Sequence, residues 1–122
     1  VVLDGVISAW DEIWELSTVS TDCGDLLIPK AGTVVGTTIR VRILAKDVSL
    51  MESPKSKSSI LNQLSADVLE LSRDQNTAMS LVNLRVKSAH LVARISRKSI
   101  DQLKIAPGKS LWVQIKAAAV LN

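Results

Sequence analysis

The sequence has few aromatic residues and one cysteine. Tryptophan is the only aromatic type, at Trp10, Trp14 and Trp112, with no phenylalanine or tyrosine among 122 residues. The core must therefore be aliphatic, and three scattered tryptophans are a poor set of stacking platforms for single-stranded nucleic acid. The lone Cys23 cannot form an internal disulfide, which favours a reducing compartment. No apolar run is long enough to span a membrane.

Catalytic signatures are also missing. The sequence has no glycine-rich phosphate loop followed by Lys-Ser or Lys-Thr, so we expect no ATP hydrolysis from this chain. No nucleophile–base pair, carboxylate pair or metal-ligand spacing stands out, and His90 alternates with apolar residues as an ordinary strand residue does. We therefore expect no enzyme and no intrinsic cofactor.

The remaining composition is that of a folded protein. Hydrophobic residues make up 47 % and charged residues 22 %, and the length suits one domain or two very small subdomains that share a core. The net charge of +3 suits small anions or an acidic neighbour and does not require nucleic acid. Because the chain begins at Val1 without methionine, we expect a domain excised from a longer protein.

Alternation of apolar and polar residues predicts mostly β structure. In the first strand Val1, Leu3, Gly5, Ile7 and Ala9 should share one face. A single short helix should begin at a Ser96 cap and stop before Pro107 and Gly108. The predicted strands number about eight and cover 1–9, 13–19, 26–28, 39–43, 64–71, 78–86, 89–95 and 111–117. This count favours a small barrel or sandwich.

The chain also repeats itself. The apolar pattern of 36–48 recurs 72 residues later at 108–120, and Leu3–Ile7 resembles Leu64–Val68 at an offset of 61 residues. Two alternating strands also produce such a match by chance. If the repeat is real, the helical segment 97–105 accounts for most of the difference between the offsets, and each half closes only against its neighbour. We predict a first half at 1–51, a polar linker at 52–58 and a second half at 59–122.

Three segments together carry a family resemblance. The segment 39–50 (IRVRILAKDVSL), the segment 58–62 (SSILN) and the ending 93–120 (ARISRKSIDQLKIAPGKSLWVQIKAAAV) resemble the C-terminal domain of molybdate ABC-transporter ATP-binding subunits. The ending is also similar to the molbindins, small molybdate-binding proteins. The resemblance implies the transport-associated OB-type (TOBE), molbindin-like barrel, which exchanges strands or pairs between subunits.

The resemblance also implies an oxyanion site. The positions that match the family's oxyanion-binding positions are Ser59, Ile60, Ser96, Ser99, Lys116 and Ala117. Leu61 stands where the family's Ser-Ile-Arg-Asn motif has arginine, so the strongest anion donor is replaced. Without the resemblance, Ser96 reads as an ordinary helix cap and Lys116 as a solvated strand residue.

The implied function is regulatory. Molybdate or tungstate, with sulfate left open, would bind between two copies and modulate transport, while ATP and magnesium would bind a missing ATPase domain. Partners would be a second copy and the permease subunits, at the cytoplasmic face of a bacterial inner membrane, with no nucleic acid. The alternative is a purely structural dimerisation domain that has lost the oxyanion site. An OB-type nucleic-acid binder is the least favoured reading.

Overall fold

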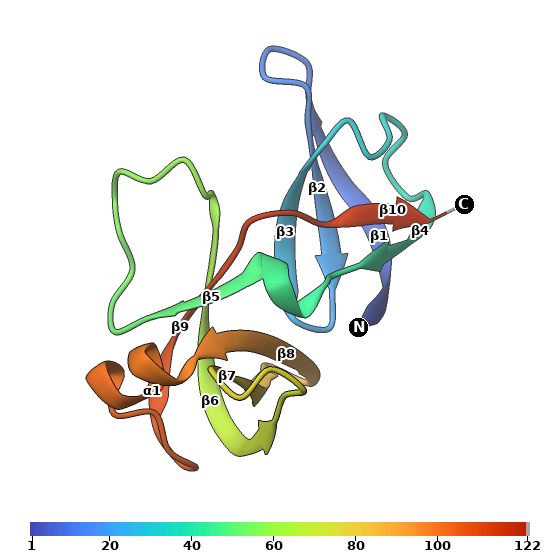
Figure 1. Ribbon diagram of the computed structural model, residues 1–122. Helices are drawn as coiled ribbons and strands as arrows, with labels where there is room; N and C mark the ends of the chain where they lie inside the picture. Colours follow the sequence, from blue (N-terminus) through green and yellow to red (C-terminus); the bar gives the residue numbers. More distant parts are fainter. Residues whose placement is uncertain (122) are drawn as a thin grey trace.

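Ten strands and one short α-helix form the described part of the chain, residues 1–121 of the computed structural model (Figure 1). The first half contains β1 (Val2–Asp11), β2 (Leu16–Thr21), β3 (Gly24–Pro29), β4 (Thr38–Arg42), the 3₁₀ turn η1 (Ala45–Asp47) and β5 (Val48–Met51). The second half contains β6 (Asn62–Arg73), β7 (Met79–Val86), β8 (Ala89–Ser96), α1 (Arg97–Leu103), β9 (Ser110–Ile115) and β10 (Ala119–Leu121). The expected mostly-β fold with two related halves and one short helix is confirmed.

The strands form two five-stranded antiparallel sheets that exchange their last strands. The first sheet has the order β10-β4-β1-β2-β3 and the second the order β5-β9-β6-β7-β8. In Figure 1 the red β10 leaves the second half to lie beside β4, and β5 leaves the first half to lie beside β9. Each sheet is therefore completed by a strand from the other half of the chain.

Strand pairing supports the predicted repeat. Gly5 lies opposite Ile39 in the first sheet, and Ala66 lies opposite Leu111 in the second. These four residues match at the two predicted offsets, 61 for the opening strands and 72 for their partners. The two sheets thus share one register as well as one strand order, which chance alternation does not explain.

A bulge occurs at the same place in both halves. The register of β1 shifts between Ile7 and Ala9, and that of β6 shifts between Val68 and Glu70. An extra residue at a bulge moves the side chains beyond it to the other face of the strand. Ala9 is consequently exposed, and the prediction that it shares the face of Ile7 is wrong.

The match fails at the exchanged strands. Val48 lies opposite Ile115, so a constant offset of 72 residues would place Val120 opposite Ile43. Val120 instead lies opposite Val41, two residues away. The first half makes the crossing with the three-residue turn η1, which the second half lacks. The predicted equivalence of Val48 and Val120 is therefore wrong by two residues.

The β1–β2 hairpin ends in an exposed apolar tip. The Oδ1 atom of Asp11 accepts hydrogen bonds from the N–H groups of Ile13 (2.9 Å) and Trp14 (3.1 Å), which closes a turn. Ile13 is 83 % and Trp14 73 % exposed, and the second strand begins only at Leu16. The prediction of a strand from residue 13 is wrong because the Asp11 side chain satisfies the backbone there.

Three other element predictions need correction. The estimate of about eight strands is low, because β5 and β10 are separate short strands after the crossings. The predicted strand 111–117 ends at Ile115, where the chain leaves β9. The helix prediction is confirmed at its start, since the Ser96 side chain accepts the Ser99 N–H, but α1 ends earlier than Pro107, at a left-handed Lys104.

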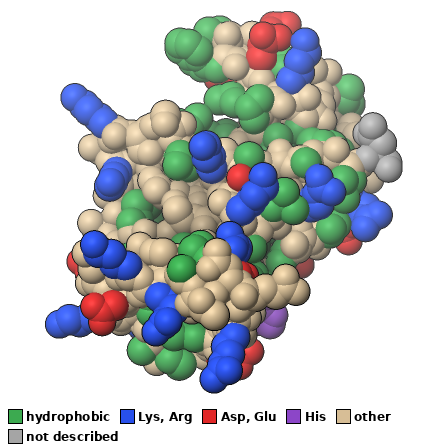
Figure 2. Space-filling view, viewed as in Figure 1, with side chains coloured by type: hydrophobic (Ala, Val, Ile, Leu, Met, Phe, Trp, Pro, Cys, Tyr) green, Lys and Arg blue, Asp and Glu red, His purple; other side chains and the backbone are tan. Residues whose placement is uncertain are grey.

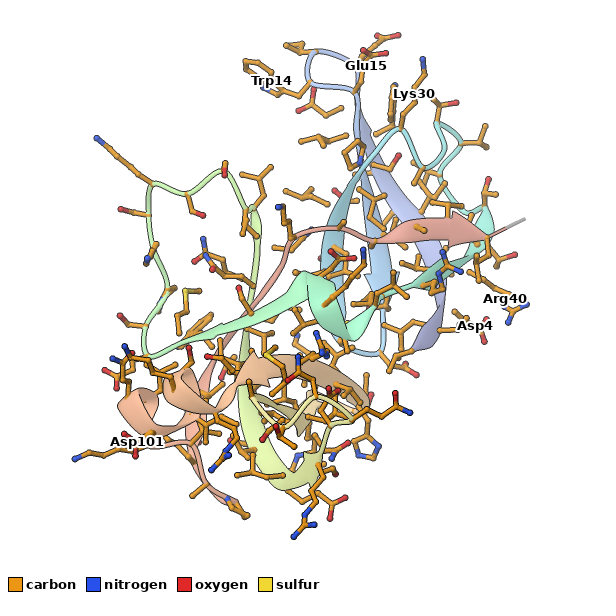
Figure 3. All side chains as sticks on the ribbon, viewed as in Figure 1. Asp4, Trp14, Glu15, Lys30, Arg40 and Asp101 are labelled. Atoms are coloured by element: carbon orange, nitrogen blue, oxygen red, sulfur yellow. The ribbon has the colours of Figure 1, made fainter. Side chains whose placement is uncertain are left out.

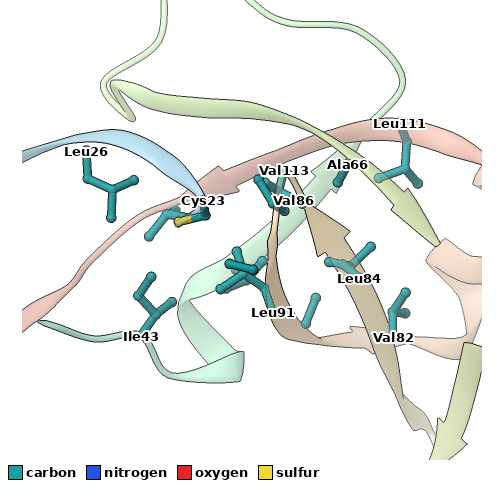
Figure 4. Close-up of a cluster of buried hydrophobic side chains, with 14 of the residues drawn as sticks. Cys23, Leu26, Ile43, Ala66, Val82, Leu84, Val86, Leu91, Leu111 and Val113 are labelled. Carbon is teal, nitrogen blue, oxygen red and sulfur yellow. The ribbon is translucent and has the colours of Figure 1, made fainter. Parts of the chain in front are cut away.

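A single aliphatic core joins the two sheets (Figure 4). Leu26, Ile43 and Cys23 from the first half lie in the same buried cluster as Leu84 and Val113 from the second. The core consists mainly of Val, Leu, Ile and Ala side chains, as the absence of phenylalanine and tyrosine requires. The predicted linker 52–58 falls between β5 and β6, and the division at 1–51 and 59–122 stays a prediction.

Asn62 holds the start of β6 against β3. Its Oδ1 accepts the Leu27 N–H and its Nδ2 donates to the Leu27 carbonyl, each at 2.8 Å. The amide thus pairs with both backbone groups of a residue in the other sheet. In the part of the chain described, no buried side-chain N or O atom lacks a hydrogen-bond partner.

We expect Asn62→Ala to destabilise the protein. The substitution leaves the Leu27 N–H and carbonyl without their partners, which should cost about 2 kcal/mol of unfolding free energy. Asn83→Ala is the matched control, because the Asn83 side chain donates one hydrogen bond, to Ser72. Urea unfolding followed by circular dichroism measures both. An Asn62→Ala loss no larger than that of Asn83→Ala would contradict the assigned role.

Candidate oxyanion site

Four of the six candidate residues lie at one end of the β6–β9 pair. Asn62, the first residue of β6, lies opposite Ile115, the last residue of β9. Ser59 and Ile60 shortly precede Asn62, and Lys116 and Ala117 directly follow Ile115. The antiparallel pairing therefore brings together two segments that are far apart in the sequence.

Lys116 and Ala117 line a pocket between the two edges of the first sheet. The cavity has a volume of about 460 Å³. One wall is the end of β3, Leu27 to Lys30, and the other is the segment from Lys116 to Ala118 with Val120; Asn62 also lines the pocket. No carboxylate is among the lining residues in the described chain, so the charged side chains of the pocket are lysines.

The backbone leaves a donor free at this pocket. The Lys116 N–H donates to the Asp47 carbonyl at 2.8 Å, where the two crossing segments meet. Within residues 1–121, no hydrogen bond is made by the N–H of Ala117, which follows in the gap between β9 and β10. An ammonium group and a free N–H beside a small cavity can bind an anion.

Ser96 and Ser99 lie elsewhere. Ser96 is opposite Met79, at the other end of the second sheet from Asn62. Its Oγ accepts the Ser99 N–H at 3.1 Å and donates to the Ser99 Oγ at 2.9 Å. The two hydroxyls thus cap the seven-residue α1 and contact each other, and the structure does not bring them to Lys116 within one chain.

The segment before β6 presents Ser59 to solvent. The neighbouring Ser58 is instead fixed by hydrogen bonds, because its Oγ accepts one from the Ile60 N–H at 3.1 Å and one from Gln114 Nε2 at 3.4 Å. The Ile60 N–H is therefore used internally. Leu61, at the arginine position of the family motif, is 57 % exposed and supplies no hydrogen-bond donor from its side chain.

Sequence reasoning missed the two other lining residues with polar side chains, Asn62 and Lys30. Asn62 is the last residue of the SSILN segment, so the sequence shows the asparagine. Its hydrogen bonds to Leu27 form only because β3, in the other sheet, lies close to the start of β6. Lys30 follows Pro29 at the end of a strand and carries no motif. Only closure of the first sheet brings it to the same pocket as Lys116.

A larger hollow, of about 880 Å³, lies on the first sheet and contains none of the candidate residues. Its lining includes Asp4, Asp22 and Arg40, so carboxylates outnumber cations there. Figure 3 shows Asp4 and Arg40 close together, where they face each other across the neighbouring strands β1 and β4. This hollow suits an anion less well than the smaller pocket with two lysines.

The remaining electrostatic features lie outside the pocket. Burial raises the pKa of the Cys23 thiol, as expected for an inert core cysteine. Hydrogen bonds from Ser110 and Arg85 lower the pKa of Asp67, and those from Arg94 and the Asn76 N–H lower that of Asp74. Figure 2 shows Lys and Arg side chains spread over both sheets on the face in view.

The described residues contain neither a metal-binding cluster nor a membrane-spanning helix. Residues 1–121 contain no group of three or more His, Cys, Asp or Glu placed to hold a metal ion. In the same residues, α1 is far shorter and less apolar than a membrane-crossing helix has to be.

Two half-barrels that exchange their last strands, with a pocket lined by two lysines beside the crossing, define the class of small, duplicated β domain to which this chain belongs. The family model of the TOBE domain matches residues 58–121, which is more than half of the chain. The chain therefore belongs to the TOBE domain family, and the family resemblance seen in the sequence is confirmed.

Curated relatives cover the whole chain. It is 43 % identical over 124 residues to the molybdenum import ATP-binding protein ModC of Saccharophagus degradans, covering 100 % of this chain and 34 % of the relative. It is 44 % identical over 122 residues to ModC of Thiobacillus denitrificans, with the same two coverages. The chain thus spans about a third of the length of these relatives.

A solved structure shares the fold. The cytoplasmic molybdate-binding protein ModG, crystallised with molybdate bound, superposes with a TM-score of 0.80 at 19 % identity. The match covers 99 % of this chain and 93 % of ModG. At this identity the similarity establishes the fold alone.

We expect Ser96→Ala to lower the unfolding free energy by about 1 kcal/mol, the usual cost of losing a helix cap. Ser56→Ala, in the exposed segment before β6, is the control and should change little. Thermal and urea unfolding measure the effect without any anion present. An unchanged stability would contradict the capping role of Ser96.

Proposed function

We propose that this chain is the regulatory domain of the ATP-binding subunit of a molybdate importer and binds molybdate or tungstate. The observation that carries the proposal is the pocket at the strand crossing, where Lys116 and the unpaired Ala117 N–H lie together. The ModC relatives favour a molybdate transporter as the parent protein. ATP and magnesium would bind the part of those relatives that this chain does not span.

The donor set suits a tetrahedral dianion. Molybdate accepts many hydrogen bonds and needs charge compensation, which Lys116 and the Ala117 N–H can supply at the pocket. The Ser59 hydroxyl is exposed on the segment before β6 and is not among the lining residues, so it would have to turn toward the anion. Because the Ile60 N–H already donates to Ser58, its binding role would require that local hydrogen bond to open. Ser59, Lys116 and Ala117 are therefore the first residues to test.

We place the proposed site between two copies, and the separation of the serines from Lys116 supports this arrangement if all of them bind the anion. Ser96 and Ser99 lie at the opposite end of the second sheet from Lys116, so one chain does not combine both groups. A second copy could bring its Ser96 and Ser99 to the pocket of the first. Anion binding would then stabilise a homodimer and, through the attached ATPase subunits and their permease partners, lower transport when cytoplasmic molybdate is plentiful.

A structural role without an anion is the second candidate. The observation that favours it is Leu61, which places a 57 % exposed apolar side chain where the family motif has arginine. Exposed apolar side chains are commonly covered by a partner protein. In this reading the domain dimerises and holds the ATPase subunits together, and its melting temperature does not respond to molybdate.

The proposal predicts that millimolar molybdate raises the melting temperature, because a ligand that binds only the native state stabilises it. At a hundredfold excess over Kd the gain is about 2.7 kcal/mol. Lys116→Met should abolish most of the shift, whereas Lys87→Asn, which removes a charge at a left-handed turn that asparagine tolerates, should keep it. Sulfate and phosphate serve as anion controls.

Differential scanning fluorimetry measures the shifts and light scattering measures the oligomeric state. A wild-type protein that stays dimeric and shows no shift with molybdate would contradict anion sensing and favour the structural role.

A further inference from the structure

We propose that Lys30 is a second cation of the oxyanion pocket and that Glu15 competes with the anion for it. This inference rests on the proposed function and adds a residue and a control to the same site. Lys30 belongs to the wall formed by β3, and Lys116 belongs to the facing wall. An anion between the walls can therefore meet one lysine from each.

Charge balance favours two lysines. Molybdate carries two negative charges, and a single ammonium leaves one of them uncompensated inside a partly enclosed pocket. The lining residues in the described chain include Lys30 and Lys116 as charged groups and no carboxylate. Leu61, exposed beside Asn62, cannot supply the second charge.

The backbone of Lys30 is held at the rim of the pocket. Its φ of +47° is left-handed, an unusual conformation for a residue other than glycine. Its N–H donates to the Glu15 carbonyl at 2.9 Å, which ties the end of β3 to the β1–β2 turn. The position of the side chain's base is thus set by the fold, while its end remains free to move in solvent.

In this structure the Glu15 carboxylate pairs with the ammonium group of Lys30. Lys30 Nζ lies 3.5 Å from Glu15 Oε1, and the two side chains are 73 % and 61 % exposed. Figure 3 shows the two residues together near the tip of the hairpin. Such an exposed ion pair contributes little free energy, so a dianion in the pocket can draw Lys30 away from it.

The competition gives two opposite expectations. Removing the Lys30 charge should weaken molybdate binding by about tenfold, as expected for one charge pair at a protein surface. Removing the Glu15 charge frees Lys30 and should tighten binding by about two- to threefold, since exposed ion pairs are weak. Lys30→Arg should keep most of the affinity because it keeps the charge.

Isothermal titration with sodium molybdate at low salt tests the inference on the 122-residue chain. The variants are Lys30→Met, Lys30→Arg and Glu15→Gln, with Lys87→Asn as the control for loss of a distant positive charge. Melting temperatures without molybdate show whether each variant is folded. Lys30 is exposed, so Lys30→Met keeps its side-chain stem without burying new surface.

Four outcomes are distinguishable. Weaker binding by Lys30→Met and tighter binding by Glu15→Gln, with Lys30→Arg and Lys87→Asn close to wild type, support the inference, and unchanged binding by Glu15→Gln overturns the competition. Equal binding by Lys30→Met and wild type overturns it and leaves the proposed oxyanion site standing on Lys116. A wild-type chain that does not bind molybdate overturns both.

Discussion

Each sheet of this protein depends on a strand from the other half of the chain. β10 pairs with β4 and β5 pairs with β9, so the last strand of each half completes the sheet of the other. The two crossing segments are joined where the Lys116 N–H donates to the Asp47 carbonyl. Without the exchange, β4 and β9 would present open edges. The shared core and the single cluster of buried side chains follow from the same arrangement.

The candidate site is a consequence of this crossing. A strand that leaves one ladder before it joins another passes through residues whose backbone groups have no strand partner, and Ala117 is such a residue. The gap also separates the segment after β9 from the end of β3, which leaves the cavity that Lys30 and Lys116 line. The fold therefore creates a small basic pocket without dedicating a loop to it.

The sequence predicts the faces of the strands better than their partners. Alternation identified the buried residues of β9, and the repeat offsets agree with pairs such as Gly5 with Ile39. Period-two alternation carries no information about which strand lies alongside, so the exchange of β5 and β10 was not predictable from it. The β1–β2 tip was mispredicted because Ile13 and Trp14 are apolar, and the turn depends on the Asp11 side chain.

The site was predictable only in part for the same reason. Resemblance identified Lys116, which follows a recognisable strand, and grouped it with Ser96, which the fold places at the other end of the sheet. Lys30 and Asn62 line the pocket because the first sheet closes and because the Asn62 amide pairs with Leu27. Both facts belong to tertiary structure. A single sequence records the residue types but not this approach.

The duplication also shows that the two halves have diverged in chemistry. Strand pairing makes Leu44 the counterpart of Lys116, since Leu44 follows Ile43 as Lys116 follows Ile115. By the β2–β3 and β7–β8 registers, Ile95 is the counterpart of Lys30.

Apolar side chains thus occupy both lysine positions of the repeated pair. A pocket that depends on two lysines can therefore bind a dianion at one crossing and not at its counterpart. The crossing from β9 to β10 has Lys116 where the other crossing has Leu44, and the facing wall has Lys30 where the other half has Ile95. A dimer of such chains would carry one basic pocket per chain, although each chain contains two copies of the fold.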